Sequence, residues 1–146
     1  MSAQQFPLPA EGLCPPGWEL VVRTAIVRLG SDLSLYTDTN HASLGVESVT
    51  VDEGWLEVRT DFDGAREKCL SATASVDATL AGKGVFVGAS GGASLTRYAL
   101  YSARTLGHYP AFSRIPASST VFSSAIDNLW ITHLSLRRVA QDGGAV

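Results

Sequence analysis

The chain has 146 residues, of which 45% are hydrophobic and 17% are charged, and its formal net charge is -3. This length can bury the core of one ordinary domain without a framework of disulfides or metal ions. The basic residues are dispersed, apart from the neighbours Arg137 and Arg138, which argues against nucleic acid as a partner. No apolar run approaches the roughly 18 residues of a membrane span, so no membrane partner is expected.

Residues 1–17 are predicted to form an extended arm, because their prolines remove backbone donors and fix φ. An arm of this kind is ordered only where it lies on a surface, either that of its own domain or that of a neighbouring subunit. Phe6, Leu8 and Leu13 are therefore candidate contacts in an assembly. The segment lacks the charged and apolar regions of a signal peptide, so the chain is expected to stay in a cytoplasm or in an assembly built there.

Residues 18–139 are predicted to form an all-β domain, with residues 140–146 as a C-terminal tail. Residues that favour strands gather in short runs, and turn signals separate these runs at intervals of roughly 8–12 residues. This pattern is typical of a β-sandwich or jelly roll. The expected strands are residues 18–29, 31–36, 47–52, 55–61, 69–79, 84–87, 95–103, 118–124 and 128–139.

The strand at residues 69–79 has the clearest pattern. Small apolar residues, beginning with Leu70, alternate with polar ones, which predicts one half-buried face and one wet face. The alternative is a helix over residues 73–81 that ends at Gly82, since alanine favours helices and glycine often ends them. The strict period of two favours the strand. Because the apolar face is mostly alanine, the tryptophans are expected to cover it.

Two turns are predicted: a hairpin turn at residues 52–54, and a tight turn at residues 88–92, where glycines reach positive φ. The second segment, G-A-S-G-G, also fits the G-x-S-x-G nucleophile elbow and is similar to the Gly-Asp-Ser-Gly-Gly signature of trypsin-like proteases. The elbow requires a following helix, whereas a strand pattern follows here. A small serine hydrolase that uses Ser90 is therefore kept as a third hypothesis.

The sequence indicates no metal site, cofactor or catalytic residue. His41, His108 and His133 lack the spacing of a compact metal site, and His133 is expected at a surface or an interface. Cys14 and Cys69 allow one disulfide and are expected to be two reduced, semi-buried thiols. The acidic residues lie in turns, where they are expected to be solvated rather than paired for acid–base catalysis. The chain is therefore not expected to be an enzyme.

Trp55 is the aromatic residue expected to be most exposed, because it shares the polar face of its strand with Glu57 and Arg59. It is therefore a candidate contact in an assembly, beside the three residues of the arm. Two alternatives remain for the tryptophans and tyrosines as a group. They either fill the core of the sandwich or form a platform on which a sugar stacks.

Residues 77–92 (DATLAGKGVFVGASGG) and 127–132 (DNLWIT), with the proline-rich arm and the low charge, resemble in style the small β-sandwich structural proteins of tailed-phage virions. These include decoration (cement), head-fibre and minor tail proteins. The alanine- and arginine-rich composition is similar to that of proteins from phages of actinobacterial hosts.

The resemblance implies a non-enzymatic virion protein that forms a homo-oligomer, a trimer among the options, and contacts a major capsid or tail protein. Assembly would also protect the strand edges that every all-β chain must manage. The alternative function is a carbohydrate-binding module of a phage tail or fibre. The alternative location is the cytoplasm.

Overall fold

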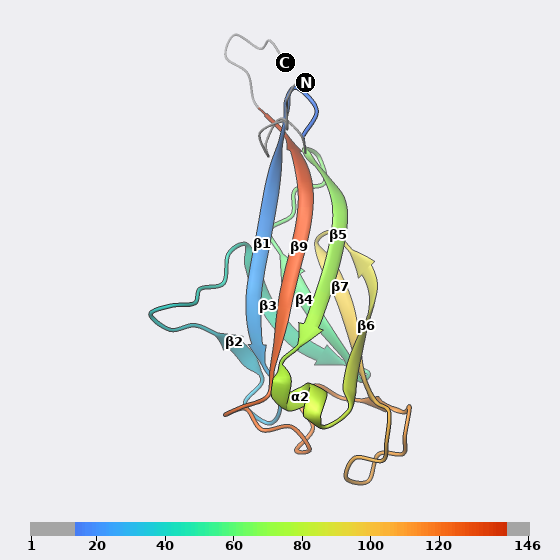
Figure 1. Ribbon diagram of the computed structural model, residues 1–146. Helices are drawn as coiled ribbons and strands as arrows, with labels where there is room; N and C mark the ends of the chain where they lie inside the picture. Colours follow the sequence, from blue (N-terminus) through green and yellow to red (C-terminus); the bar gives the residue numbers. More distant parts are fainter. Residues whose placement is uncertain (1–13, 140–146) are drawn as a thin grey trace, which may run out of the picture.

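The computed structural model describes residues 14–139 (Figure 1). The predictions for Phe6, Leu8 and Leu13, and for the tail at residues 140–146, lie outside this range. The elements are β1 (Trp18–Arg28), β2 (Ser34–Tyr36), β3 (Val46–Asp52), β4 (Trp55–Thr60), β5 (Glu67–Val76), α2 (Ala78–Gly82), β6 (Val85–Gly92), β7 (Leu95–Ser102), β8 (Arg114–Ile115) and β9 (Asn128–Arg138).

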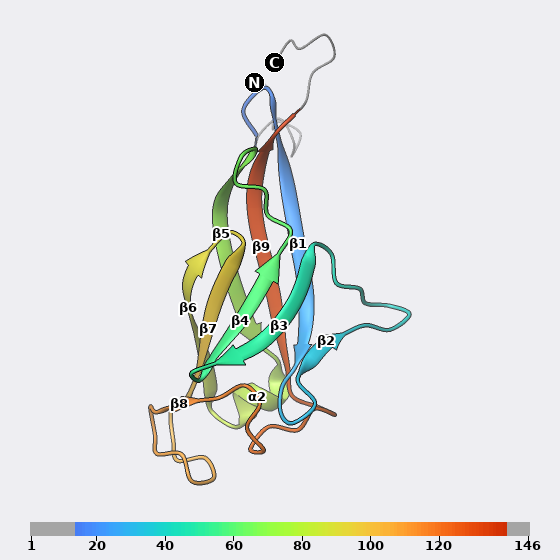
Figure 2. The ribbon, with the colours of Figure 1, turned by 180° about the vertical axis from the view of Figure 1, so that it is seen from behind.

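The strands form two antiparallel sheets that pack face to face, which confirms the prediction of an all-β sandwich. The A sheet has the order β2-β1-β9-β5, and the B sheet has the order β3-β4-β7-β6 with β8 beside β7. The upper parts of β1, β9 and β5 extend past the B sheet, and the β4–β5 connection covers this extension (Figure 2). No helix within residues 14–139 is long and apolar enough to cross a membrane.

The apolar core fills the part of the sandwich where the two sheets overlap. In the A sheet, the cross-strand partners Val27 and Leu129 and the partners Ala25 and Ile131 are all buried. The B sheet covers them with side chains that are at most 1% exposed, namely Leu56, Val58, Tyr98 and Leu100. Burying an aliphatic side chain contributes about 1.5–3 kcal/mol, so these rows hold the sheets together.

A register shift in β5 corrects the predicted alternation of residues 69–79. The pairing with β9 slips between Cys69 and Ser71, so Leu70 leaves the apolar face and is 53% exposed. Beyond this bulge, the alanine face of β5 packs beside Tyr98, whose hydroxyl donates a hydrogen bond of 3.3 Å to the carbonyl of Thr73. The expectation that tryptophans cover this face is therefore wrong.

The end of β5 combines the two interpretations weighed for residues 73–81. The strand ends at Val76, and α2 begins after Asp77, which caps the helix by accepting a 3.0 Å hydrogen bond from the amide of Leu80. The other carboxylate oxygen of Asp77 accepts from the amide of Asn128 at 3.0 Å. One aspartate thus ends the strand, begins the helix and fixes the start of β9.

The predicted turns have mixed outcomes. The hairpin turn between β3 and β4 is confirmed, with Glu53 and Gly54 at φ 50° and 84°, as a type I′ turn requires. Residues 88–92 are not a turn but the second half of β6, and the chain reverses at residues 93–94. Residues 118–124 form turns instead of the expected strand.

Candidate functional site

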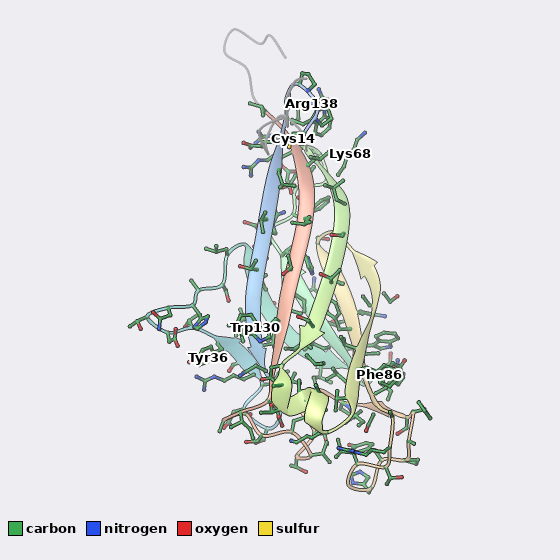
Figure 3. All side chains as sticks on the ribbon, in the orientation of Figure 1. Cys14, Tyr36, Lys68, Phe86, Trp130 and Arg138 are labelled. Carbon is green, nitrogen blue, oxygen red and sulfur yellow. The ribbon has the colours of Figure 1, made fainter. Side chains whose placement is uncertain are left out.

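A recess lies on the outer face of the A sheet, where β2 joins β1. The pairing register places Tyr36 of β2 beside Ile26 of β1, and Ile26 beside Trp130 of β9. Figure 3 shows Tyr36 and Trp130 near each other at this end of the sheet. The recess, here called the Trp130 recess, has a volume of about 320 Å³, which suits a small ligand. Its lining residues are Ile26, Arg28, Tyr36, His41, Ser124, Ala125, Asn128 and Trp130.

The β2–β3 connection supplies one wall of the recess and is organised by Asp38. One carboxylate oxygen accepts hydrogen bonds from the amides of Asn40 and His41, each at 2.8 Å, and contacts His41 Nδ1 at 2.9 Å. The other oxygen accepts from the Tyr36 hydroxyl at 2.7 Å. The hydrogen bonds from Tyr36 and His41 lower the pKa of Asp38. The hydrogen bond between Tyr36 and Asp38 also raises the pKa of Tyr36. Asp38 therefore stays a carboxylate that fixes both rings.

His41 folds back over the sheet as a result of this turn. Its ring meets Trp130 edge-on, with 5.8 Å between the ring centroids, and lies 6.0 Å from the ring of Tyr36. Trp130 is nevertheless 45% exposed. The recess therefore presents an accessible indole whose orientation is limited by a neighbouring ring.

Within residues 14–139, one charged group of the recess has no ion-pair partner and one acceptor has no hydrogen-bond donor. The guanidinium of Arg28 lies 4.5 Å from the centroid of the Tyr36 ring, and no carboxylate within these residues forms an ion pair with it. The side-chain oxygen of Asn128 is buried and accepts no hydrogen bond. A buried acceptor without a donor is uncommon in proteins and costs roughly 1–3 kcal/mol.

A second polar cluster, here called the Arg23 cluster, consists of three buried residues, Arg23, Glu67 and Ser135, and of Asp61, which is exposed at its margin. Arg23 donates two hydrogen bonds to the two oxygens of Glu67, at 2.8 and 2.9 Å, and a third from Nε to Asp61 at 2.5 Å. Ser135 donates to Glu67 at 2.8 Å. Burial alone would raise the pKa of Glu67, but these bonds outweigh it and hold the pKa at about 2.

His133 corrects a sequence expectation, because it is 4% exposed and points into the sandwich rather than to a surface. It lies beside Arg23 in the β1–β9 register, and its Nε2 is 2.8 Å from the hydroxyl of Tyr98. Burial, followed by the charge of Arg23, lowers the pKa of His133, so the imidazole is neutral at pH 7. His133 therefore joins Arg23, Glu67 and Ser135 as a buried polar residue between the two sheets.

A third feature is an aromatic band on the outer face of the B sheet, defined by Trp55, Phe86, Tyr101, Phe112 and Arg114. Phe86 and Tyr101 are cross-strand partners with stacked rings, 5.5 Å between centroids, and Phe112 lies 6.4 Å from Phe86. Arg114 pairs with Tyr101 and lies 4.5 Å from the ring centroid of Trp55. Phe86 and Phe112 are 45% and 66% exposed. Figure 3 shows Phe86 beside β6, far from the Trp130 recess.

The remaining chemical candidates are not brought together. Ser90 is exposed in the middle of β6, opposite Arg97, and not on a strand-to-helix elbow. Cys14 and Cys69 are both free thiols, as expected, but only Cys14 is partly buried, and Cys69 is exposed. Within residues 14–139, no group of three or more His, Cys, Asp or Glu could hold a metal ion.

Trp55 lies in the aromatic band, where Arg114 covers its ring, and it is only partly exposed. Trp130 is more exposed than this predicted contact. The residues of the Trp130 recess are far apart in the sequence, and the spacing of Tyr36, Asp38 and His41 is the only local signal among them, one for a side-chain-organised turn. No family model, curated protein or solved structure matches this chain.

Proposed function

We propose that this chain is a non-enzymatic structural protein of a virion, an oligomeric β-sandwich that decorates or stabilises a phage capsid or tail. The observation that carries the proposal is the aromatic band. Large apolar side chains that stand together on a surface are typical of protein–protein contacts, and aromatic residues with arginine are enriched there. In the same proposal, the sandwich is a jelly roll, and the arm at residues 1–17 lies on a neighbouring subunit.

Light scattering of the purified chain tests the oligomer. The expected result is a mass above that of one chain, reduced to a monomer by the double variant Phe86→Ser, Phe112→Ser. Val22→Ser is the matched control, because Val22 is 47% exposed on the other sheet, similar to Phe86. A wild-type chain that is monomeric at every concentration would contradict oligomerisation through the band.

Purified particles test the virion assignment. The chain is expected among the proteins identified by mass spectrometry of heads or tails, and its absence from both would contradict the assignment. Deletion of residues 1–16 is expected to leave the sandwich folded and to abolish attachment. Unchanged attachment would remove the arm from the proposal. Neighbouring portal, protease and major capsid genes would favour decoration, whereas a tape-measure gene would favour the tail.

We propose carbohydrate binding as a second function, because the Trp130 recess offers an accessible indole beside hydrogen-bonding groups. An aromatic ring with polar groups at its margin suits a sugar, which has apolar faces and a polar edge. A glycan array that includes polysaccharides of the host wall tests this function. Trp130→Ala is expected to abolish binding, and Trp55→Ala, which removes a tryptophan outside the recess, is expected to leave it unchanged. Binding to no glycan would contradict it.

A further inference from the structure

We propose that the Trp130 recess recognises saccharides through a carboxylate group, so that its ligands are acidic sugars such as hexuronic acids. This inference rests on the second proposed function, carbohydrate binding at the same recess. It follows from which groups of the recess are already engaged and which are left without partners.

The carboxylate of Asp38 is engaged within the protein. Its two oxygens together accept from two backbone amides and the Tyr36 hydroxyl, and one of them also contacts the His41 ring. An amine or a cation bound in the recess would need a carboxylate with open positions, and Asp38 has few left. The recess therefore does not favour a positively charged ligand.

Arg28 is the open charge of the recess. Its guanidinium carries five N–H donors in a planar fork, and within residues 14–139 it makes no ion pair. The ring of Tyr36 lies 4.5 Å from it and restricts its position. A guanidinium held in this way matches the two oxygens of a carboxylate and forms paired, charge-assisted hydrogen bonds with it.

Asn128 supplies the complementary group. It is the cross-strand partner of Arg28, so both side chains lie in the row next to Ile26 and Trp130. Its buried side-chain oxygen accepts no hydrogen bond within the described part of the chain. This oxygen is not exposed to the recess, so a sugar hydroxyl would supply the missing donor only after the Asn128 side chain turns outward.

A carboxylated pyranose has all three features that these groups require: an anionic group, a hydroxyl donor and an apolar ring face for Trp130. A phosphate ester has a second negative charge, and the recess offers one guanidinium near the fixed negative charge of Asp38. Charge complementarity therefore favours the singly charged carboxylate.

The test uses matched oligosaccharides that differ only in having a carboxylate or a hydroxymethyl group at C6, such as oligogalacturonate and oligogalactose. Isothermal titration is expected to show at least about tenfold tighter binding of the acidic member, with the difference reduced at high salt. Arg28→Gln is expected to remove this preference. Arg138→Gln is the matched control, because Arg138 also lies over an aromatic ring, 4.7 Å from the centroid of Trp18, and belongs neither to the recess nor to the aromatic band.

The outcomes separate the inference from the function on which it rests. Equal affinity for both members, lost in Trp130→Ala, would overturn the acidic preference and keep carbohydrate binding. Binding to neither member, nor to any matched pair on a wider array, would overturn both. If Arg28→Gln still bound the acidic oligosaccharide more tightly, another group would bind the carboxylate, and the role of Arg28 would be overturned. Thermal melting confirms that each variant is folded.

Discussion

The Arg23 cluster contains an arginine and an aspartate, and the Trp130 recess contains Arg28 beside the loop that Asp38 organises, but only in the Arg23 cluster does the arginine form ion pairs. The buried Arg23 directs two donors at the buried Glu67 and a third at Asp61, which is exposed. Arg28 instead lies over an aromatic ring. The carboxylate of the nearby Asp38 accepts hydrogen bonds from residues of its own loop and from Tyr36. The two regions therefore use similar residues for opposite purposes.

The difference distinguishes a structural cluster from a binding site. Buried charges are tolerated only when they are paired and hydrogen-bonded, so the Arg23 cluster has little capacity left for a ligand. The recess lies on an outer face, where an unpaired guanidinium remains solvated at low cost. Its remaining donors are available to a ligand. Variants in the two regions should consequently separate stability from binding.

Glu67→Leu should give the largest effect, because it leaves the guanidinium of Arg23 buried without its main partner. Removing one partner of a buried ion pair costs about 3–5 kcal/mol, measured here as the free energy of unfolding in urea. Glu19→Leu is the control, since Glu19 and its partner Arg137 are both partly exposed and such pairs contribute about 0–1 kcal/mol. Equal losses for both variants would contradict the special status of the Arg23 cluster.

Acid should weaken the Arg23 cluster by a comparable amount. The pKa of Glu67 is about 2 in the folded chain, below the value of about 4.3 for an unfolded glutamate. The stabilisation is therefore complete above about pH 4.3 and is lost as the pH falls towards 2, by a total on the order of 3 kcal/mol.

Urea unfolding at several pH values measures this loss. Glu67→Gln should reduce the slope between pH 4.3 and 2 but not abolish it, because hydrogen bonds from Lys83, Ser123 and Thr79 outweigh burial and lower the pKa of Asp127 as well. An unchanged slope in Glu67→Gln would assign the acid sensitivity to other groups.

Gly45→Ala should have a smaller effect on the same cluster. Gly45 has a φ of 74°, and an added Cβ would lie 2.7 Å from Cγ of Arg23 and 3.0 Å from an oxygen of Asp61. Gly17→Ala separates the backbone strain of a positive φ from the steric clash of the added Cβ, because Gly17 has a φ of 84° and open space around it. We expect losses of about 2–3 kcal/mol for Gly45→Ala and about 1 kcal/mol for Gly17→Ala, measured by urea unfolding. Equal losses would mean that the cluster tolerates the added methyl group.

The strands were largely predictable because their signals are local. The hairpin turn at Glu53 and Gly54 needs two residues at positive φ, and a glycine between two strand patterns indicates such a turn from the sequence alone. The bulge at Leu70 has no such signal, since it arises from how β5 pairs with β9. The same long-range pairing shifts the inward face of β5 by one residue, which local alternation could not indicate.

The burial of His133 was not predicted for a related reason. The face with Trp130 and the face with His133 are similarly mixed in polarity, and the face with His133 is buried because Arg23 and Glu67 meet there from other strands. The Trp130 recess also depends on strand order, because Tyr36 and Trp130 become neighbours only across β1. A single sequence contains the residues of both clusters but not the order of the strands that brings them together.

Asp38→Ala should give the smallest change in stability and the clearest local one. Its carboxylate holds the amides of Asn40 and His41 in an exposed loop, so the variant, which removes the acceptor, should speed hydrogen exchange at these two amides while the urea midpoint stays close to that of the wild type. Asp32→Ala is the control, since it also removes one exposed acid near β2 and should change neither quantity. A midpoint that falls as far as in Glu67→Leu would place the loop in the cooperative core. Unchanged exchange at both amides would mean that Asp38 does not position His41, and the wall of the recess would then need another support.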